Sequence, residues 1–188
     1  MKRTIGLISD THGYLDPSVL DHFAECDQIW HAGDFGTLEI ADRLADSKPF
    51  LAVYGNIDDH SIQDAYPLDQ RFDCCGVDVW ITHIAGYPGR YDRRVNKQLK
   101  QNPPQLLICG HSHMLRIDRD KTHQQLLCVN PGAAGHHGFH LVRTIMIVRF
   151  ADKQIANLKI IELGPRGVRD DVDPKTVDLG SYKIPDRN

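Results

Sequence analysis

The sequence contains no apolar run approaching the roughly 18 residues that a helix needs to cross a bilayer, and we expect no membrane association. It also lacks internal repeats and any linker-like segment, so a length of 188 residues predicts a single domain. The start, Met1-Lys2-Arg3-Thr4, leads directly into a strand-like segment rather than into the apolar region of a signal peptide. A basic excess is missing too. The formal net charge of −3 argues against nonspecific binding of a long polyanion such as nucleic acid.

Cysteines are few, and none of them forms a C-x-x-C pair. The five are Cys26, Cys74, Cys75, Cys109 and Cys128. Their odd number and their position in apolar, strand-like runs predict buried free thiols, which suit a reducing compartment, and we expect a cytoplasmic protein. The charged share of 25% and the apolar share of 41% are ordinary globular values, which exclude a disordered or fibrous chain. The eleven histidines are the unusual feature of the composition.

The first third of the chain alternates between strand and helix patterns. Short apolar runs predict strands, and apolar residues at helical spacing behind Asp16-Pro17 and Thr37 predict helices. The expected strands cover residues 4–9, 28–32 and 50–54, and the expected helices cover residues 17–26 and 38–45. This βαβαβ order is typical of a parallel sheet with right-handed crossovers.

The remainder of the chain predicts a more mixed arrangement. We expect a hairpin over 71–75 and 77–82, a surface helix over 88–100, a buried strand over 106–109, and antiparallel strands over 115–118, 125–129, 144–150 and 155–163. The last four strands would form a second sheet packed against the first. Residues 1–163 would then make up the domain. Residues 164–188 form a polar tail that either wraps the surface or is partly disordered.

Side chains that commonly bind metal ions follow five of the predicted strands. They are Asp10 and His12, then Asp34, Asn56, His83, and finally His111 with His113. The carboxyl ends of parallel strands share one edge of a sheet, where ligands bind in open α/β folds. Taken singly, each side chain has an ordinary alternative as a helix cap, a turn former or a buried histidine. The convergence of seven such side chains favours a metal site.

These motifs resemble those of the calcineurin-like metallophosphoesterase family. They read Asp10-Thr11-His12, Gly33-Asp34, Gly55-Asn56-Ile57-Asp58, His83 and Gly110-His111-Ser112-His113, in the family's order and across about residues 4–150. The compact size and the stretches His31-Ala32-Gly33-Asp34 and Asn130-Pro131-Gly132 resemble the small prokaryotic phosphodiesterase branch of that family.

The resemblance implies an α/β fold, a four-layer α-β-β-α sandwich, that binds two metal ions. Asp10, His12, Asp34 and His113 would hold the first ion. Asp34, Asn56, His83 and His111 would hold the second, so that Asp34 bridges the two. Catalytic roles would fall to Asp34, Asn56 and His83, with Asp58 as the partner that orients a ligand or, alternatively, as a turn residue.

The chemistry of these ligands indicates a phosphoesterase. Imidazoles mixed with carboxylates suit Mn, Ni, Fe, Zn or Co better than Ca or Mg, and we expect Mn. Two divalent ions facing two carboxylates and four neutral imidazoles leave a formal charge of +2 that attracts a phosphate, and a metal-bridging hydroxide would be the nucleophile. We therefore predict a dinuclear metal-dependent phosphodiesterase acting on a small or activated phosphate ester. The alternatives are a catalytically silent scaffold on the same fold and a metal-dependent nuclease.

The chain departs from the family pattern at four places. Ile84 follows His83 where related small members often carry a glycine. Ile57 stands where larger members carry a histidine that is thought to protonate the leaving group, so the general acid is in question. Ala133 replaces a serine found in related small members. His136, His137 and His140 form an additional cluster, which is either a solvated loop or a functional element, that is, a cleft wall or a substitute proton donor. The resemblance and the sheet edges further lead us to expect a homo-oligomer, a homodimer or larger.

Overall fold

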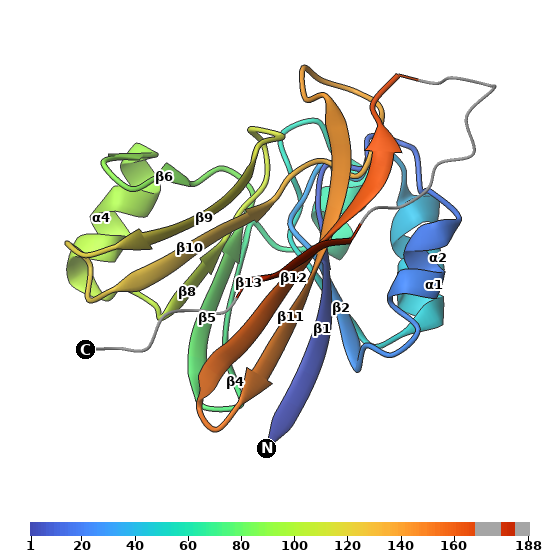
Figure 1. The fold of residues 1–188 in the computed structure, drawn as a ribbon. Helices are drawn as coiled ribbons and strands as arrows, with labels where there is room; N and C mark the ends of the chain where they lie inside the picture. The colour runs from blue at the N-terminus through green and yellow to red at the C-terminus, as the bar shows by residue number, and fades with distance from the viewer. Residues whose placement is uncertain (168–177, 183–188) are drawn as a thin grey trace.

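The computed structural model describes residues 1–167 and 178–182 and contains two β-sheets that pack face to face (Figure 1). The first sheet consists, in spatial order, of β13 (Asp178–Tyr182), β12 (Gln154–Pro165), β11 (Val142–Ala151), β1 (Lys2–Ile8), β2 (Gln28–His31) and β3 (Phe50–Ala52). The second consists of β4 (Asp69–Cys74), β5 (Val77–Thr82), β8 (Leu106–Ile108), β10 (Leu126–Pro131) and β9 (Leu115–Asp120). A small hairpin pairs β6 (Gly86–Tyr87) with β7 (Arg90–Tyr91).

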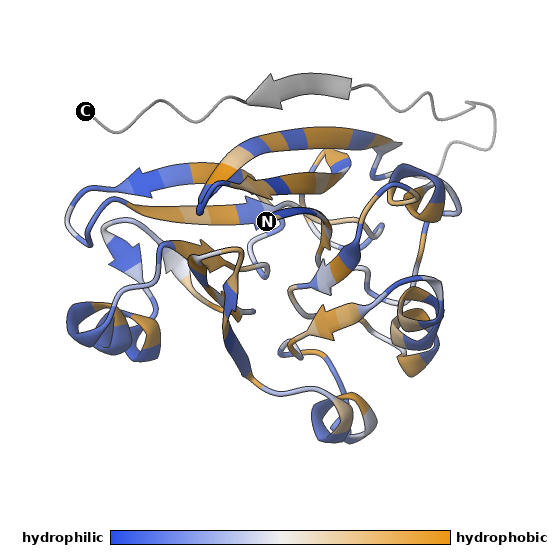
Figure 2. Ribbon diagram, turned by 90° about the horizontal axis from the view of Figure 1, so that it is seen from below, coloured by the Kyte–Doolittle hydropathy of each residue, from blue (hydrophilic) through white to orange (hydrophobic). Residues whose placement is uncertain are grey.

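Helices cover the outer faces of both sheets. The helices α1 (Ser18–His22) and α2 (Leu38–Ser47) lie on one side, and α4 (Arg93–Gln101) lies on the other. Figure 2 shows these layers from below. The short helix α3 (His60–Ala65) follows β3. This confirms the predicted four-layer α-β-β-α sandwich.

The period-two alternation of the strands divides the apolar side chains between three clusters. On β1, Ile5 and Leu7 point into the core between the sheets, whereas Ile8 faces α1 and α2. Gly6 faces the same way as Ile8, and it lets the Phe23 ring pack directly on the strand: an added Cβ would lie 2.6 Å from the ring. A third, smaller cluster packs α4 against the second sheet. The registers that place the site are therefore fixed by burial on both faces of each sheet.

The prediction that four C-terminal strands form the second sheet is wrong for two of them. The strands β9 and β10 do join the second sheet, but β11 and β12 return to the first. There β11 pairs antiparallel with β1 from Lys2 to Leu7. In the predicted parallel sheet, one edge of β1 has no partner, and any long amphipathic strand could pair with it. The hydrophobic periodicity of a strand does not indicate which sheet the strand joins.

The helix predictions need smaller corrections. The first helix ends at His22 rather than at residue 26, and the predicted helix over 88–100 begins only at Arg93. Asp92 is its N-cap, because its side chain accepts the backbone N–H groups of Arg94 and Val95. The helix α3 was not predicted, and its signal is again a capping aspartate, Asp59.

The predicted state of the cysteines is confirmed, since all five are free and Cys75 alone among them is more than slightly exposed. Among the described residues no helix is long and apolar enough to cross a membrane, and the longest, α2, has 10 residues. Of the polar tail, the structure describes residues 164–167 and 178–182, and β13 pairs there with β12. The prediction for the rest of the tail falls outside the described residues.

Candidate metal centre

The strand ends with ligand-type side chains come from both sheets, not from one as predicted. Asp10 and His12 follow β1, Asp34 follows β2 and Asn56 follows β3, whereas His83 follows β5 and the His111-Ser112-His113 loop follows β8. The two sheets meet at this end through hydrogen bonds between their loops. The backbone N–H of His111 donates to both Asp10 carboxylate oxygens (3.1 and 3.2 Å), and His83 Nδ1 lies 2.7 Å from the Ala32 carbonyl.

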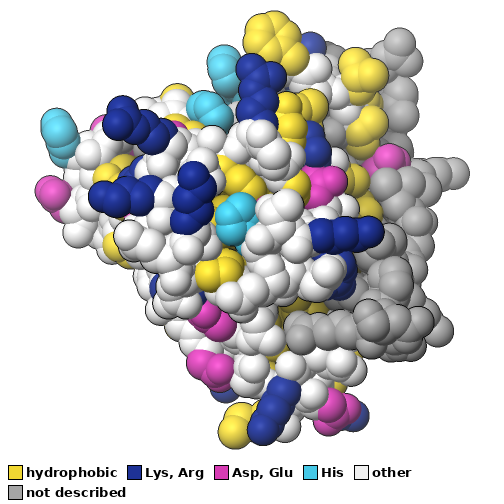
Figure 3. Space-filling view, turned by 90° about the vertical axis from the view of Figure 1, so that its left-hand side faces the viewer, with side chains coloured by type: hydrophobic (Ala, Val, Ile, Leu, Met, Phe, Trp, Pro, Cys, Tyr) yellow, Lys and Arg dark blue, Asp and Glu magenta, His cyan; other side chains and the backbone are white. Residues whose placement is uncertain are grey.

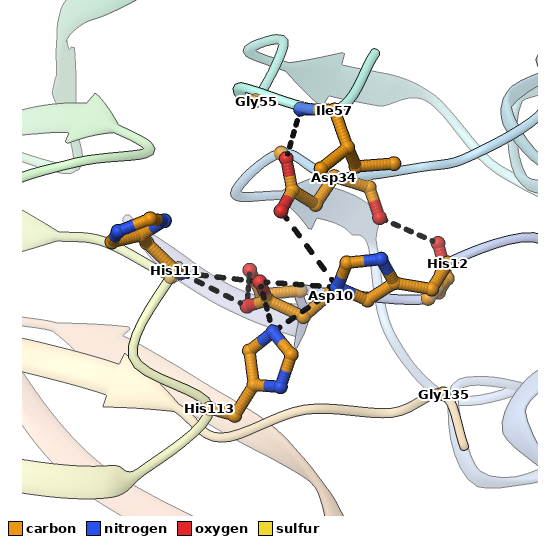
Figure 4. Close-up of polar contacts among 12 residues, drawn as sticks. Asp10, His12, Asp34, Gly55, Ile57, His111, His113 and Gly135 are labelled. Atoms are coloured by element: carbon orange, nitrogen blue, oxygen red, sulfur yellow. Dashed lines mark hydrogen bonds and ion pairs between the residues drawn. The ribbon is translucent and has the colours of Figure 1, made fainter. Parts of the chain in front are cut away.

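Asp10, His12, Asp34 and His113 form the first group of side chains that could hold an ion (Figure 4). His12 Nε2 and His113 Nε2 are 3.0 Å apart, and His113 Nε2 lies 3.2 Å from Asp10 Oδ1. His12 Nε2 also lies 3.7 Å from Asp34 Oδ2. Ligand atoms from four residues thus point at a common position, as they do around a metal ion.

Asp34, His83 and His111 form a second group, which shares Asp34 with the first. His83 Nε2 lies 3.2 Å from Asp34 Oδ1. The Ala32 carbonyl accepts the Nδ1 proton of His83, which leaves the Nε2 lone pair for an ion in the neutral ring. That Nε2 atom is buried, and the described residues give it no hydrogen bond of good geometry; its charged neighbour is the Asp34 carboxylate. A cation next to Asp34 would satisfy it, so the residues present fit a metal ion.

The charges around this pair favour a cation. Burial lowers the pKa of His83, but Asp34 and Asp10 raise it more, so the net pKa lies above its usual value. Burial raises the pKa of Asp34, yet the His83 ring and the Ile57 N–H lower it more, and Asp34 is ionised at neutral pH. Burial holds the pKa values of His12 and His111 below the usual range, which keeps both rings neutral and able to bind an ion.

Five of the seven predicted ligands have left-handed backbone conformations. Their φ angles are 54° at Asp10, 47° at His12, 60° at Asp34, 66° at His111 and 57° at His113. Such φ values are uncommon outside glycine and are retained where the surrounding structure holds them in place, typically at functional sites. The backbone therefore turns sharply after each strand and directs these side chains into one space.

Two glycines allow the loops to approach the ligands closely. A Cβ at Gly55 would lie 2.0 Å from Asp34 Oδ1, and a Cβ at Gly110 would lie 2.1 Å from Ser9 Oγ and 2.6 Å from Asp10 Oδ2. Both positions therefore require glycine for steric reasons. The Gly-Asn and Gly-His parts of the sequence motifs thus have a direct structural cause.

Asp58 holds the backbone around Asp34 rather than touching its side chain. Its carboxylate accepts the backbone N–H groups of Asp34 (3.1 Å), Gly36 (2.9 Å) and Gly55 (2.8 Å). Of the two readings of the sequence, a positioning partner and a turn residue, the structure supports the first. Both carboxylate oxygens of Asp58 accept hydrogen bonds from these backbone groups, so we regard Asp58 as a positioning residue.

Asn56 and Ile57 lie at the rim of the centre. The Ile57 N–H donates to Asp34 Oδ1 (3.1 Å), and its side chain is exposed. Asn56 lines a cavity together with His83. The structure therefore brings Asn56 beside the second group.

Sequence reasoning missed two supporting groups. His31 is fully buried and stacks on Phe35. Its Nδ1 accepts the Gly33 N–H, so Nε2 carries the proton and donates to Thr11 Oγ1. Burial lowers the pKa of His31 to about 3. The Asn130 side chain donates to the Gly110 carbonyl (2.7 Å) and so fixes the loop that carries His111. Both residues lie in stretches that resemble the small prokaryotic branch of the family, and this resemblance could have identified them.

The additional histidines border the first group. The His137 ring centroid is 4.8 Å from that of His12, and the His140 ring centroid is 5.4 Å from that of His113. The His136 ring lies against Tyr14. The loop is thus a wall of the site, which favours the second of the two interpretations of this cluster.

Comparisons with known proteins agree with this geometry. The sequence profile of the calcineurin-like phosphoesterase superfamily domain matches residues 3–153. A probable metallophosphoesterase of Methanocaldococcus jannaschii is 33% identical over 164 residues, which cover 84% of this chain and 81% of that protein. The crystal structure of zinc-bound Vps29 from Entamoeba histolytica shares the fold, with a TM-score of 0.68, 19% identity and coverage of 94% of this chain and 99% of Vps29. The structure of an archaeal phosphodiesterase also shares it, with a TM-score of 0.67, 22% identity and coverage of 85% and 99%.

Proposed function

Because the chain belongs to the calcineurin-like phosphoesterase superfamily, we propose that it is a metal-dependent phosphodiesterase that hydrolyses a small or activated phosphate ester. The observation that carries this proposal is the pair of ligand groups that share Asp34. Two ions bridged by one carboxylate are the arrangement that two-metal phosphoesterases use.

The ligand chemistry favours transition-metal ions, and we propose Mn, with Ni, Fe, Zn and Co as alternatives. When bound, the two ions would supply an activated water and would stabilise the charge of the phosphoryl oxygens. The chain's own part is to hold this arrangement. Asp10, His12 and His113 would hold the first ion, Asn56, His83 and His111 the second, and Asp34 both.

The formal charge of this centre supports an anionic substrate. Asp10 and Asp34 contribute two negative charges, and the four imidazoles are neutral when they bind an ion. Two divalent ions would leave a charge of about +2 in a cleft that is largely buried, where electrostatic attraction is stronger than in water. A phosphate ester therefore fits the centre better than a neutral ester.

Ile57 supports a diester with a good leaving group. This position offers no acidic proton, so a poor leaving group would have to depart without general acid catalysis, which typically contributes about 10²–10⁴-fold. A diester also carries a single negative charge and demands fewer additional donors than a monoester does. The His137 ring, which borders His12, is a candidate for a substitute acid.

The experiment is to measure turnover of matched mono- and diesters by the purified protein after removal of metal and after addition of Mn, Ni, Fe, Zn or Co. We expect no turnover in the chelated protein, its return with Mn, and faster hydrolysis of the diester. A protein that binds two ions but hydrolyses no ester would support the scaffold alternative. Faster hydrolysis of DNA or RNA than of small diesters would support the nuclease alternative.

A further inference from the structure

A cavity of about 370 Å³ opens directly beside the second ligand group. Asn56 and His83 belong both to this cavity and to the predicted set of ligands for the second ion. Its volume lies within the roughly 300–1,000 Å³ that small-molecule sites occupy. Any phosphate ester seated at the ions would therefore have an adjacent space for one of its substituents.

The exposed part of the cavity wall includes large apolar side chains that could contact a ligand. Tyr54, Leu68 and Ile84 line it, and Leu68 and Ile84 are 41% and 37% exposed, high values for large apolar side chains. Leu68 is held in place because the Tyr54 N–H donates to the carbonyl of the preceding residue, Pro67 (3.1 Å). An exposed apolar surface at a cleft commonly marks a binding site.

Two charged side chains of the wall, Arg94 and Asp92, already have partners within the protein. Arg94 donates to Asp69 (2.5 Å) and to Thr82 Oγ1 (2.7 Å), so both terminal nitrogens of its guanidinium are already paired, although the side chain is 35% exposed. Asp92 caps α4, and its carboxylate would repel a negatively charged group. Among the described residues that line the cavity, no unpaired Lys or Arg is available to a second phosphate, whereas Lys and Arg side chains gather on the face of the molecule that Figure 3 shows.

We infer that this cavity binds an apolar, ring-sized substituent of the phosphate ester, and that Leu68 and Ile84 determine this specificity. The inference rests on the proposed function, because it takes the phosphate to lie at the ions. It deepens that function by naming the substrate class: phosphodiesters that carry an aromatic or branched aliphatic group, rather than esters with a second charged group.

Phosphonates test the cavity without turnover, because each carries one substituent and is not hydrolysed. We expect the zinc-loaded protein to bind phenylphosphonate about tenfold more tightly than methylphosphonate in calorimetric titrations. Tenfold corresponds to about 1.4 kcal/mol, the value expected for burial of roughly 55 Å² of apolar surface. In methyl-labelled protein, the NMR signals of Leu68 and Ile84 should shift with phenylphosphonate but not with methylphosphonate.

The variants Leu68→Asn and Ile84→Asn should lose most of this preference while their affinity for methylphosphonate stays unchanged. Leu38→Asn is the matched control. Leu38 is 37% exposed, like Ile84, but it begins α2 and does not line the cavity, so its variant should keep the preference. Equal affinities for the two phosphonates in the wild type, or an unchanged preference in both cavity variants, would overturn the inference.

The same variants separate this inference from the proposed function. With phenyl and methyl 4-nitrophenyl phosphates, the wild type should favour the phenyl ester in kcat/KM, and the cavity variants should not. A loaded protein that binds phenylphosphonate at the cavity but hydrolyses neither ester would refute the proposed function alone. A protein that hydrolyses both esters equally well and shows no phosphonate preference would refute the cavity assignment alone.

Discussion

Replacing Asp58 with asparagine should destabilise the metal-free protein by about 3 kcal/mol. Asp58 is 3% exposed, and its two oxygens accept the backbone N–H groups of Asp34, Gly36 and Gly55. Asparagine has a single oxygen, so its NH₂ group must face at least one of these donors. The loss of a hydrogen bond to a charged acceptor costs about 1.5–3 kcal/mol, and an unpaired buried N–H costs about 1–3 kcal/mol. Together the two costs amount to about 2.5–6 kcal/mol. Because they are not fully additive, we expect a value near the lower end of that range.

Urea unfolding followed by circular dichroism, in the presence of EDTA, measures this cost without any contribution from bound metal. With a slope of about 2 kcal/mol per molar urea, the midpoint should fall by about 1.5 M. Asp59→Asn is the matched control. Asp59 also accepts backbone N–H groups, those of Ser61 and Ile62, but it is an exposed N-cap, and asparagine caps helices as well as aspartate does. Equal midpoints for Asp58→Asn and Asp59→Asn would refute the assigned role of Asp58.

Three further predictions concern the centre. Asp34→Ala should abolish hydrolysis, whereas Asn56→Ala, at a residue proposed to touch one ion, should leave measurable turnover; comparable turnover in both variants would contradict the bridging role. In diesters with leaving groups of graded pKa, the rate should fall steeply as the leaving-group pKa rises, and Ile57→His should flatten this dependence; a shallow dependence in the wild type would show that another acid is present. The pKa of His31 is about 3 in the folded protein against about 6.5 when unfolded, so the unfolded state binds the additional proton and stability falls as the pH drops from 6.5 towards 3. At pH 5 this loss amounts to about 2 kcal/mol. In urea titrations, His31→Gln should therefore lose about 2 kcal/mol less stability than the wild type between pH 7 and pH 5. If the stability of both proteins fell equally with pH, His31 would not be neutral in the fold.

Much of the centre could be predicted because each ligand stands directly after a strand that the sequence itself predicts. Asp10 and His12 follow an apolar strand directly, and so do His111 and His113. Parallel order predicts that such ends converge within one sheet, but these two pairs follow strands of different sheets, which hydrogen bonds between the loops hold together. The four layers were predicted from the family resemblance. The burial of Ile5 and Leu7 on one face of β1 and of Ile8 on the other requires material on both sides.

The missing parts depend on contacts between distant segments. The local pattern of β11 does not indicate which sheet it joins, and the structure shows that β11 returns to the first sheet to pair with β1. For Asp58 the sequence left two interpretations open. The backbone N–H groups that donate to its carboxylate belong to residues 3 to 24 positions away, so the choice between them required the structure. The left-handed φ of Asp34 was likewise not predictable, since it depends on the loops that surround this residue.

The most direct test of the two-ion centre is the number of ions that the protein binds. Metal-free wild type and Asp34→Ala should be titrated with Mn, and the bound metal counted after removal of the excess. The shared position of Asp34 predicts two ions per chain in the wild type and at most one in Asp34→Ala. Two ions in Asp34→Ala, or no more than traces in the wild type, would contradict a centre built around this carboxylate.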